Sequence, residues 1–214
     1  MPGPKIVRTA GAAALVAGAL AVGGCSAPAY RFEASASDDV VVKVPRSWTL
    51  VRSGQPATSD GSTPTPGSWL AVFDGDSRPS ISHAQANTAA QPIGIVLTFV
   101  VTKDQGKQLT LDDLRDAAGP VSAAGRSQAI LSGQSVPAVT LVSDQEWSTK
   151  TAHGVHVVYR YKLTTGEETF DKVAVTDASK TRVHVFLVHC TTSCFEAHRG
   201  EIATAVGSFT VRAS

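Results

Sequence analysis

The residues with the most reactive side chains gather near the C-terminus, in the segment HVFLVHCTTSCFEAHRGE at 184–201. Cys190, Cys194 and His198 follow the spacing C-x3-C-x3-H, and two further histidines precede them. Three kinds of chemistry fit this pattern. Thiolates and imidazoles bind zinc, a pair of thiols can cycle between oxidised and reduced forms, and two nearby cysteines can form a structural disulfide. The compartment in which the chain works decides between them.

The N-terminal segment MPGPKIVRTAGAAALVAGALAVGGC indicates export. Lys5 and Arg8 form a short basic region, and an apolar run follows at 9–22 that is too short and too rich in Gly and Ala to span a membrane stably. The run ends in Val-Gly-Gly-Cys at 22–25, which looks like a bacterial lipobox. We therefore expect a lipoprotein signal peptide at 1–24.

In proteins with this motif the cysteine becomes the lipidated N-terminus. Cys25 is then the lipidation site, residues 25–29 are a tether, and the partner at this end is the membrane itself. Two acyl chains hold a protein stably where one does not. The expected location is the extracytoplasmic face of the cell membrane. The alternative is an ordinary signal peptide that happens to contain a cysteine.

Charge and length limit the class of protein further. Removal of residues 1–24 takes away Lys5 and Arg8 and no acidic residue, which leaves 17 basic and 18 acidic side chains. The mature chain therefore carries a net charge of −1 with histidines neutral, and this balance speaks against nucleic acid as a partner. Residues 30–214 are enough for a single domain with a core of its own.

Assignment of Cys25 to lipid leaves Cys190 and Cys194 as a pair in an oxidising compartment, which favours a disulfide. The run RVHVFLVH at 182–189 is typical of a central strand, and Ser193 with Glu196 is a capping-box pair that places a helix start at Cys194. The bond would join the end of the strand to the first helical turn. Zinc bound to both cysteines, His198 and a histidine from the strand is the rival, and a redox-active pair usually has the spacing C-x-x-C.

The rest of the chain alternates between strands and polar loops. A helix is expected at 109–119, capped by Thr110, and a C-terminal helix at 194–206. The stretches at 52–67 and 74–91 are rich in turn-forming and polar residues and are expected to be loops. The pattern predicts strands at 30–34, 39–51, 68–73, 93–101, 135–147, 154–163, 169–176, 182–189 and 208–211. The strands from 135 onward are expected to form an antiparallel meander.

The clearest alternation of side chains lies at 154–163, GVHVVYRYKL. Apolar and aromatic residues occupy one face, and His156, Arg160 and Lys162 share the other, as in a half-solvated strand. If the strand at 182–189 lies close by, these three side chains form part of a basic face that could bind an acidic partner. Trp69 directly follows the loop at 52–67 and is a second candidate, as a residue that lines a cleft.

The segment VVVKVPRSWTLV at 40–51, the meander and the terminal helix that runs into Ser208 and Phe209 together resemble the PsbP-like α/β/α sandwich. With the lipobox and the paired cysteines before the last helix, the chain is most similar to the LpqN-type lipoproteins of actinobacteria over about 30–212. The resemblance implies an α+β fold, an antiparallel meander packed with helices. It implies no active-site residue, because the family has no shared catalytic motif, and the polar insert at 52–67 departs from the pattern.

Motifs for catalysis or for a cofactor are not apparent. The sequence has no phosphate-binding glycine loop and no G-x-S-x-G, and a triad of Ser143, Asp144 and His153 would be a chance combination. We expect no cofactor, no metal and no enzymatic activity. The leading hypothesis is a binding module for an envelope protein. A carrier of a small apolar ligand or envelope lipid is the alternative, and an exported hydrolase or metalloenzyme is a third.

Overall fold

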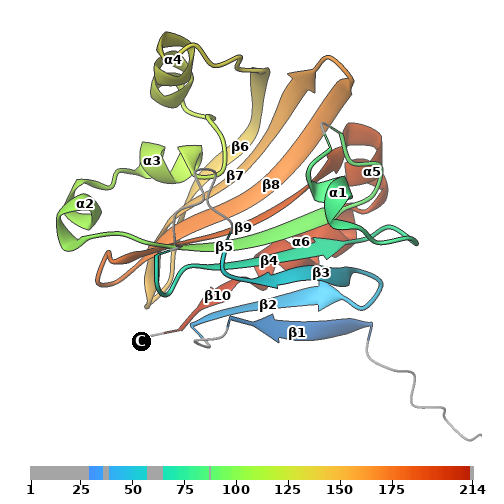
Figure 1. The fold of residues 1–214 in the computed structure, drawn as a ribbon, viewed down its shortest axis with the longest axis horizontal. Helices are drawn as coiled ribbons and strands as arrows, with labels where there is room; N and C mark the ends of the chain where they lie inside the picture. The colour runs from blue at the N-terminus through green and yellow to red at the C-terminus, as the bar shows by residue number, and fades with distance from the viewer. Residues whose placement is uncertain (1–28, 36–38, 57–64, 87, 213–214) are drawn as a thin grey trace, which may run out of the picture.

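The computed structural model confirms the predicted α+β class, with antiparallel sheets packed against helices (Figure 1). The predicted signal peptide at 1–24, the predicted lipidation site Cys25 and positions 57–64 of the predicted loop lie outside the described residues. In the part of the chain that is described, no helix is long and apolar enough to cross a membrane. The structure describes residues 29–35, 39–56, 65–86 and 88–212.

The strands form two sheets rather than one. Three strands in the order β1-β2-β10 make the smaller sheet, and seven in the order β3-β4-β5-β9-β8-β7-β6 make the larger one. The predicted meander is present as the antiparallel run β6-β7-β8-β9. The strands are β1 Tyr30–Ala34, β2 Val40–Pro45, β3 Thr49–Gly54, β4 Trp69–Asp74, β5 Ile93–Val100, β6 Ala138–Ser148, β7 Ala152–Leu163, β8 Gly166–Asp177, β9 Arg182–Thr191 and β10 Thr210–Val211.

The middle of the larger sheet is buried on both faces. β9 is buried along nearly its whole length, as its apolar sequence predicts, and most of β8 is buried too. β7 keeps the predicted alternation, with Val155, Val157 and Tyr159 fully buried and His156 and Arg160 half-buried on the opposite face. Exposure rises from β8 through β7 to β6, and β6 has no buried residue.

Helices cover the two faces of the larger sheet and create two cores. On one face Leu114 of α3 packs with the apolar side of β7. On the other, Ile202 and Val206 of α6 pack with Phe186 of β9 and with strands of the smaller sheet. The helices are α1 Ile81–Ala84, α2 Lys103–Gln108, α3 Leu111–Asp116, α4 Ala123–Leu131, α5 Thr192–Ala197 and α6 Arg199–Gly207.

Helix boundaries differ from the predictions where local capping decides them. The helix expected at 109–119 is the shorter α3, which begins after the predicted cap Thr110, and Asp113 completes a capping box with it. The C-terminal helix begins two residues earlier than predicted, because the hydroxyl of Thr191 accepts from Cys194 N. That helix is also divided at His198 into α5 and α6. α1, α2 and α4 were not predicted.

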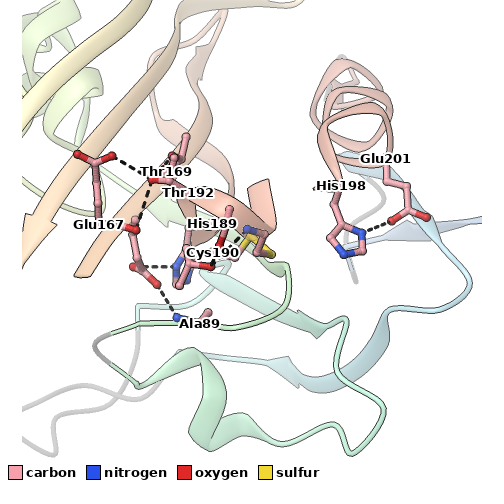
Figure 2. Close-up of a disulfide and its surroundings, with 12 residues drawn as sticks. Ala89, Glu167, Thr169, His189, Cys190, Thr192, His198 and Glu201 are labelled. Carbon is pink, nitrogen blue, oxygen red and sulfur yellow. Dashed lines mark hydrogen bonds and ion pairs between the residues drawn. A yellow bond between two sulfur atoms is a disulfide. The ribbon is translucent and has the colours of Figure 1, made fainter. Parts of the chain in front are cut away.

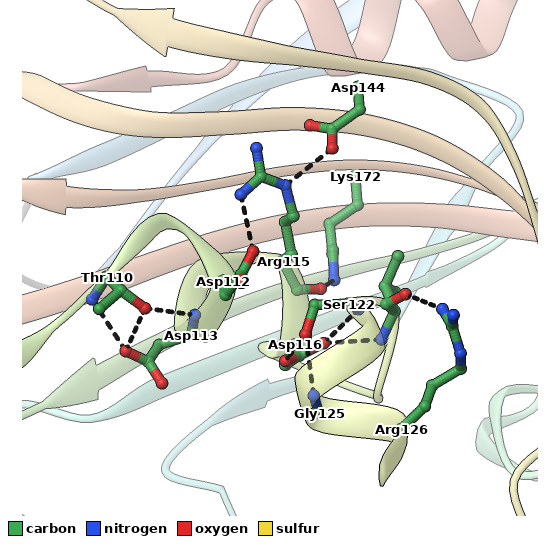
Figure 3. A network of polar contacts seen from close by, with 11 residues as sticks. Thr110, Asp112, Asp113, Arg115, Asp116, Ser122, Gly125, Arg126, Asp144 and Lys172 are labelled. Atoms are coloured by element: carbon green, nitrogen blue, oxygen red, sulfur yellow. Dashed lines mark hydrogen bonds and ion pairs between the residues drawn. The ribbon is translucent and has the colours of Figure 1, made fainter.

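A polar network fixes α3 and α4 against the larger sheet (Figure 3). One Asp116 carboxylate oxygen accepts from the backbone of Val121 and Ser122, both at 2.7 Å, and the other accepts from the Ser122 hydroxyl at 2.6 Å. Lys172 of β8, which is fully buried, donates to the carbonyls of Arg115 and Ala117 at the end of α3. The ammonium group therefore satisfies carbonyls that the short helix leaves without partners.

Burial makes Lys172 a determinant of stability at alkaline pH. Its pKa falls from 10.5 to about 8, because loss of solvation outweighs the attraction of Asp116. Between these values the unfolded chain holds the proton and the folded chain does not, so stability rises with pH. We expect the free energy of unfolding of the wild type, minus that of Lys172→Met, to increase by on the order of 2 kcal/mol from pH 8 to 10, because only the wild type carries the titrating group. Urea denaturation at each pH measures it, and a constant difference would contradict the assignment.

Candidate binding groove

An open groove lies between strands β6–β8 and helices α5–α6. Its volume is about 240 Å³. Four apolar side chains line it, namely Val142, Val158, Phe195 and Ala203. Its polar lining consists of Ser143, Arg160, Thr169, Asp171, Glu196 and Arg199. A mixed lining of this kind suits a ligand with one apolar and one charged part.

Strand alternation brings these side chains to one face. On β7, Val158 and Arg160 are two residues apart, and on β8 so are Thr169 and Asp171. The register pairs Arg160 with Thr169 and Val158 with Asp171. β6 contributes Val142 at a point where its register with β7 shifts, so an extra residue is directed to the groove.

Arg160 differs from the other charged groups of the groove. Its Nε is buried and has no hydrogen-bond partner among the described residues. Its ion pair with Glu167 joins atoms 3.9 Å apart, beyond hydrogen-bond distance. Asp171, in contrast, is bonded to His156 Nε2 at 2.6 Å, and Arg199 donates to Glu196. The groove therefore contains a cation whose donors are not satisfied by the residues that the structure describes.

The other predicted binding residues have separate positions. His156 is at the end of the groove through its bond to Asp171, and its ring meets Trp147 edge-on at 5.6 Å. Lys162 is exposed and stands opposite Glu167 in the register. Trp69 does not join this face, because it is 8 % exposed and packs into the hydrophobic core from β4.

The expected basic face is also changed by strand order. β7 is not beside β9, because β8 lies between them. On β8, Asp171 lies beside His156 and Glu167 lies beside Arg160, so this surface carries both positive and negative charge. The condition for the expected basic face, that the strands at 154–163 and 182–189 are neighbours, is therefore not met, and Arg160 is the one of the three predicted residues that lines the groove.

A disulfide between Cys190 and Cys194 positions one wall of the groove (Figure 2). It joins the end of β9 to the first turn of α5, whose Phe195 and Glu196 line the groove. Both cysteines are buried. Their sulfur atoms are bonded to each other and are therefore not available as zinc ligands.

The remaining candidates for metal or catalytic chemistry are occupied by other contacts. His198 Nδ1 lies 3.1 Å from Glu201, and among the described residues no cluster of three His, Cys, Asp or Glu could hold a metal ion. His153 bonds to Ser148 at 2.7 Å, and Asp144 accepts from Arg115 at 2.8 Å. Ser143, Asp144 and His153 therefore do not assemble into a triad.

A buried pair that the sequence did not reveal lies near the disulfide (Figure 2). Glu168 Oε2 is 3.3 Å from His189 Nδ1, and Glu168 Oε1 accepts from Ala89 N at 2.6 Å. The rings of His189, Phe170 and Tyr159 stack in sequence across three strands, and burial raises the pKa of Tyr159 well above 10. Because these contacts join a loop to the end of the sheet, the pair has a structural role. The alternation of β8 was the only available indication, since it places Glu168 on the buried face.

Comparison with solved structures shows the PsbP-like fold. The cyanobacterial PsbP protein CyanoP of Synechocystis sp. PCC 6803 is 12 % identical, with a TM-score of 0.51 over 89 % of this chain and 96 % of that one. The Ran-binding protein Mog1p of Saccharomyces cerevisiae is 8 % identical, with a TM-score of 0.44 over 85 % and 95 %. LpqN of Mycobacterium tuberculosis, described as involved in cell envelope biogenesis, is 10 % identical, with a TM-score of 0.40 over 80 % and 82 %.

Sequence comparison adds no family. No protein-family model matches the chain, and a search of curated proteins finds no significant match. At these low identities the structural likeness defines the fold class alone. What the groove binds must therefore be argued from its own residues.

Loss of the disulfide should destabilise the α5 wall without unfolding the sheet. We expect the double substitution Cys190→Ala and Cys194→Ala to lower the free energy of unfolding by about 2 kcal/mol, because the closed loop is short. Chemical denaturation of the oxidised wild type and of the variant measures this. If the denaturation curve of the variant has the same midpoint and slope as that of the wild type, the disulfide does not stabilise the domain.

Proposed function

We propose that the protein is an extracytoplasmic lipoprotein, held at the cell membrane by lipid on Cys25, and that its domain is a non-enzymatic binding module. The lipobox at 22–25 supports the anchor. The groove between β6–β8 and α5–α6 supports the binding role. A domain at the membrane surface that exposes such a groove is suited to recruit a partner of the cell envelope.

The observation that carries the proposal is the state of Arg160. The Arg160 side chain is 36 % exposed, and its guanidinium has no hydrogen bond to the residues that the structure describes. An anion in the groove would therefore pair with the exposed part of this guanidinium. Val158 and Phe195 lie in the same groove and offer apolar contact beside this charge. The expected ligand therefore carries a carboxylate or another anionic group next to an apolar group, as an acidic segment of an envelope protein does.

A second candidate is a carrier of a small apolar ligand. The apolar lining formed by Val142, Val158, Phe195 and Ala203 favours it. The open shape and the six polar side chains favour a protein segment instead, because a lipid carrier buries most of its ligand in apolar surroundings. Extraction of the purified protein with organic solvent distinguishes them, since a carrier releases a stoichiometric lipid.

The anchor predicts a defined mass and location. We expect an intact-mass spectrum of the protein extracted from membranes to show removal of residues 1–24 and a diacylglyceryl-sized addition on Cys25. Cys25→Ala should release the domain from the membrane fraction, because the lipid supplies the hydrophobic attachment. A Cys25→Ala variant that stays membrane-bound after a high-salt wash would contradict the anchor.

The groove predicts a specific dependence on Arg160. A photo-crosslinking residue at Glu196, on the rim, should capture a partner in intact cells. Arg160→Gln should reduce this capture by about tenfold, because it removes a charge-assisted hydrogen bond. Lys162→Gln is the matched control, since it neutralises a cation two residues away on β7 that is not part of the groove lining. Equal capture by both variants would refute Arg160 as the anchoring residue.

A further inference from the structure

The outer edge of β6 is the feature that the proposed function leaves unexplained. β6 is the last strand of the larger sheet, and no described strand pairs with its outer side. It runs for 11 residues, and all are exposed or half-exposed. A strand in this position presents backbone N–H and C=O groups to which another chain can pair.

Edge strands are usually protected from pairing with other chains by bulges, prolines or charged side chains, and β6 has such protection over only part of its length. The register shift near Val142 interrupts the strand, but residues 143–148 then continue in unbroken register with 158–153 of β7. No Lys, Arg or Pro occurs at 138–148. The 143–148 segment is thus long enough to accept a strand of average length, about five or six residues.

Exposed apolar side chains also occur on β6 itself. Seven large apolar side chains of the described residues are exposed, and two of them, Leu141 and Val142, directly precede the 143–148 segment. Two others, Ile130 and Leu131, belong to α4. α4 projects away from the sheets at the top of the view (Figure 1).

Two hollows flank β6 on opposite faces. The groove described above includes Val142 and Ser143. A second cavity, of about 480 Å³, lies between β6 and the α3–α4 region and includes Leu141 and Asp144. Alternate side chains of an added strand point to opposite faces of the sheet, so one set is directed toward each hollow.

Charge identifies the kind of strand that fits. Asp144 and Glu146 share one face of the segment. Asp144 is paired with Arg115, whereas Glu146 has no ion pair within the part of the chain that the structure describes. Pairing of β6 with β6 of a second copy would bring these carboxylates together, and like charges across strands are destabilising. A strand that carries Lys or Arg on this face is the complementary partner.

We propose that residues 143–148 of β6 bind an extended segment of a partner protein as an added strand, with a Lys or Arg side chain opposite Glu146. This surface adjoins the groove at Val142 and Ser143 but goes beyond the proposed function, because pairing with the backbone of 143–148 requires neither the anchor nor an anionic ligand. Backbone hydrogen bonds supply the affinity, and Glu146 with the flanking hollows supplies the selectivity.

The test uses a capped eight-residue peptide in which lysine alternates with valine, added to the isotope-labelled domain. We expect the NMR amide signals of 143–148 to shift on titration. A peptide of the same composition with its lysines and valines in separate blocks should bind at least about fivefold more weakly, because its charges no longer face Glu146. N-methylation of the lysine–valine peptide along one backbone edge should abolish binding, and N-methylation along the other edge should preserve it, because only one edge of the peptide pairs with β6.

Charge reversal provides the decisive comparison. Glu146→Lys should weaken binding of the lysine peptide by roughly fivefold and favour the matching glutamate–valine peptide. Asp104→Lys, which reverses an exposed charge on α2, is the control and should leave both affinities unchanged. Shifts confined to other strands, equal binding of all peptides, or no binding at millimolar peptide would overturn the proposal. Dimerisation through 143–148 in sedimentation experiments would overturn the choice of occupant.

Discussion

The structure depends on one constraint, the burial of β8 and β9 on both faces. Helices on one side and helices with a second sheet on the other exclude water from these strands, so nearly every side chain on them must be apolar or fully bonded. The polar exceptions show how this is met. Lys172 caps the end of α3, and Glu168 binds a loop amide and approaches His189. These two buried charges thereby attach a peripheral element to the centre of the sheet.

The same constraint explains where binding features occur. The central strands expose little surface, namely Thr169 and Asp171 of β8 in the groove, whereas β7 has one half-buried face and β6 is exposed or half-exposed throughout. The groove lies over the strands at this margin, and α5 reaches it because the Cys190–Cys194 bond holds the helix to the end of β9. A disulfide of little thermodynamic weight thus determines the position of Phe195. The proposed function and the fold are connected through this short link.

Much of the fold could be predicted from the sequence, because strand patterns are local. The alternation at 154–163 and the apolar run at 182–189 correctly indicated one half-buried and one central strand. α2 and α4 were missed because their sequences, KDQGKQ and AAGRSQAIL, carry few large apolar residues at helical spacing. Their capping residues Thr102 and Ser122 were the available indication.

The site was less predictable, because it depends on which strands are neighbours. Arg160 was identified as a candidate, but the insertion of β8 between β7 and β9 decides which acids lie beside it. A single sequence does not specify that order. Trp69 illustrates the same limit, since a tryptophan after a polar loop can face a cleft or the core, and here β4 turns it inward.

The graded exposure of the larger sheet also has a dynamic consequence. Local opening costs least where few apolar contacts are lost, so amide hydrogen exchange should become faster from β8 and β9 through β7 to β6. A β6 that opens at low cost can adjust its backbone to an incoming chain while β8 and β9 remain closed. The sheet would then combine a rigid interior with an adaptable margin, and ligand binding would appear first as slowed exchange at that margin.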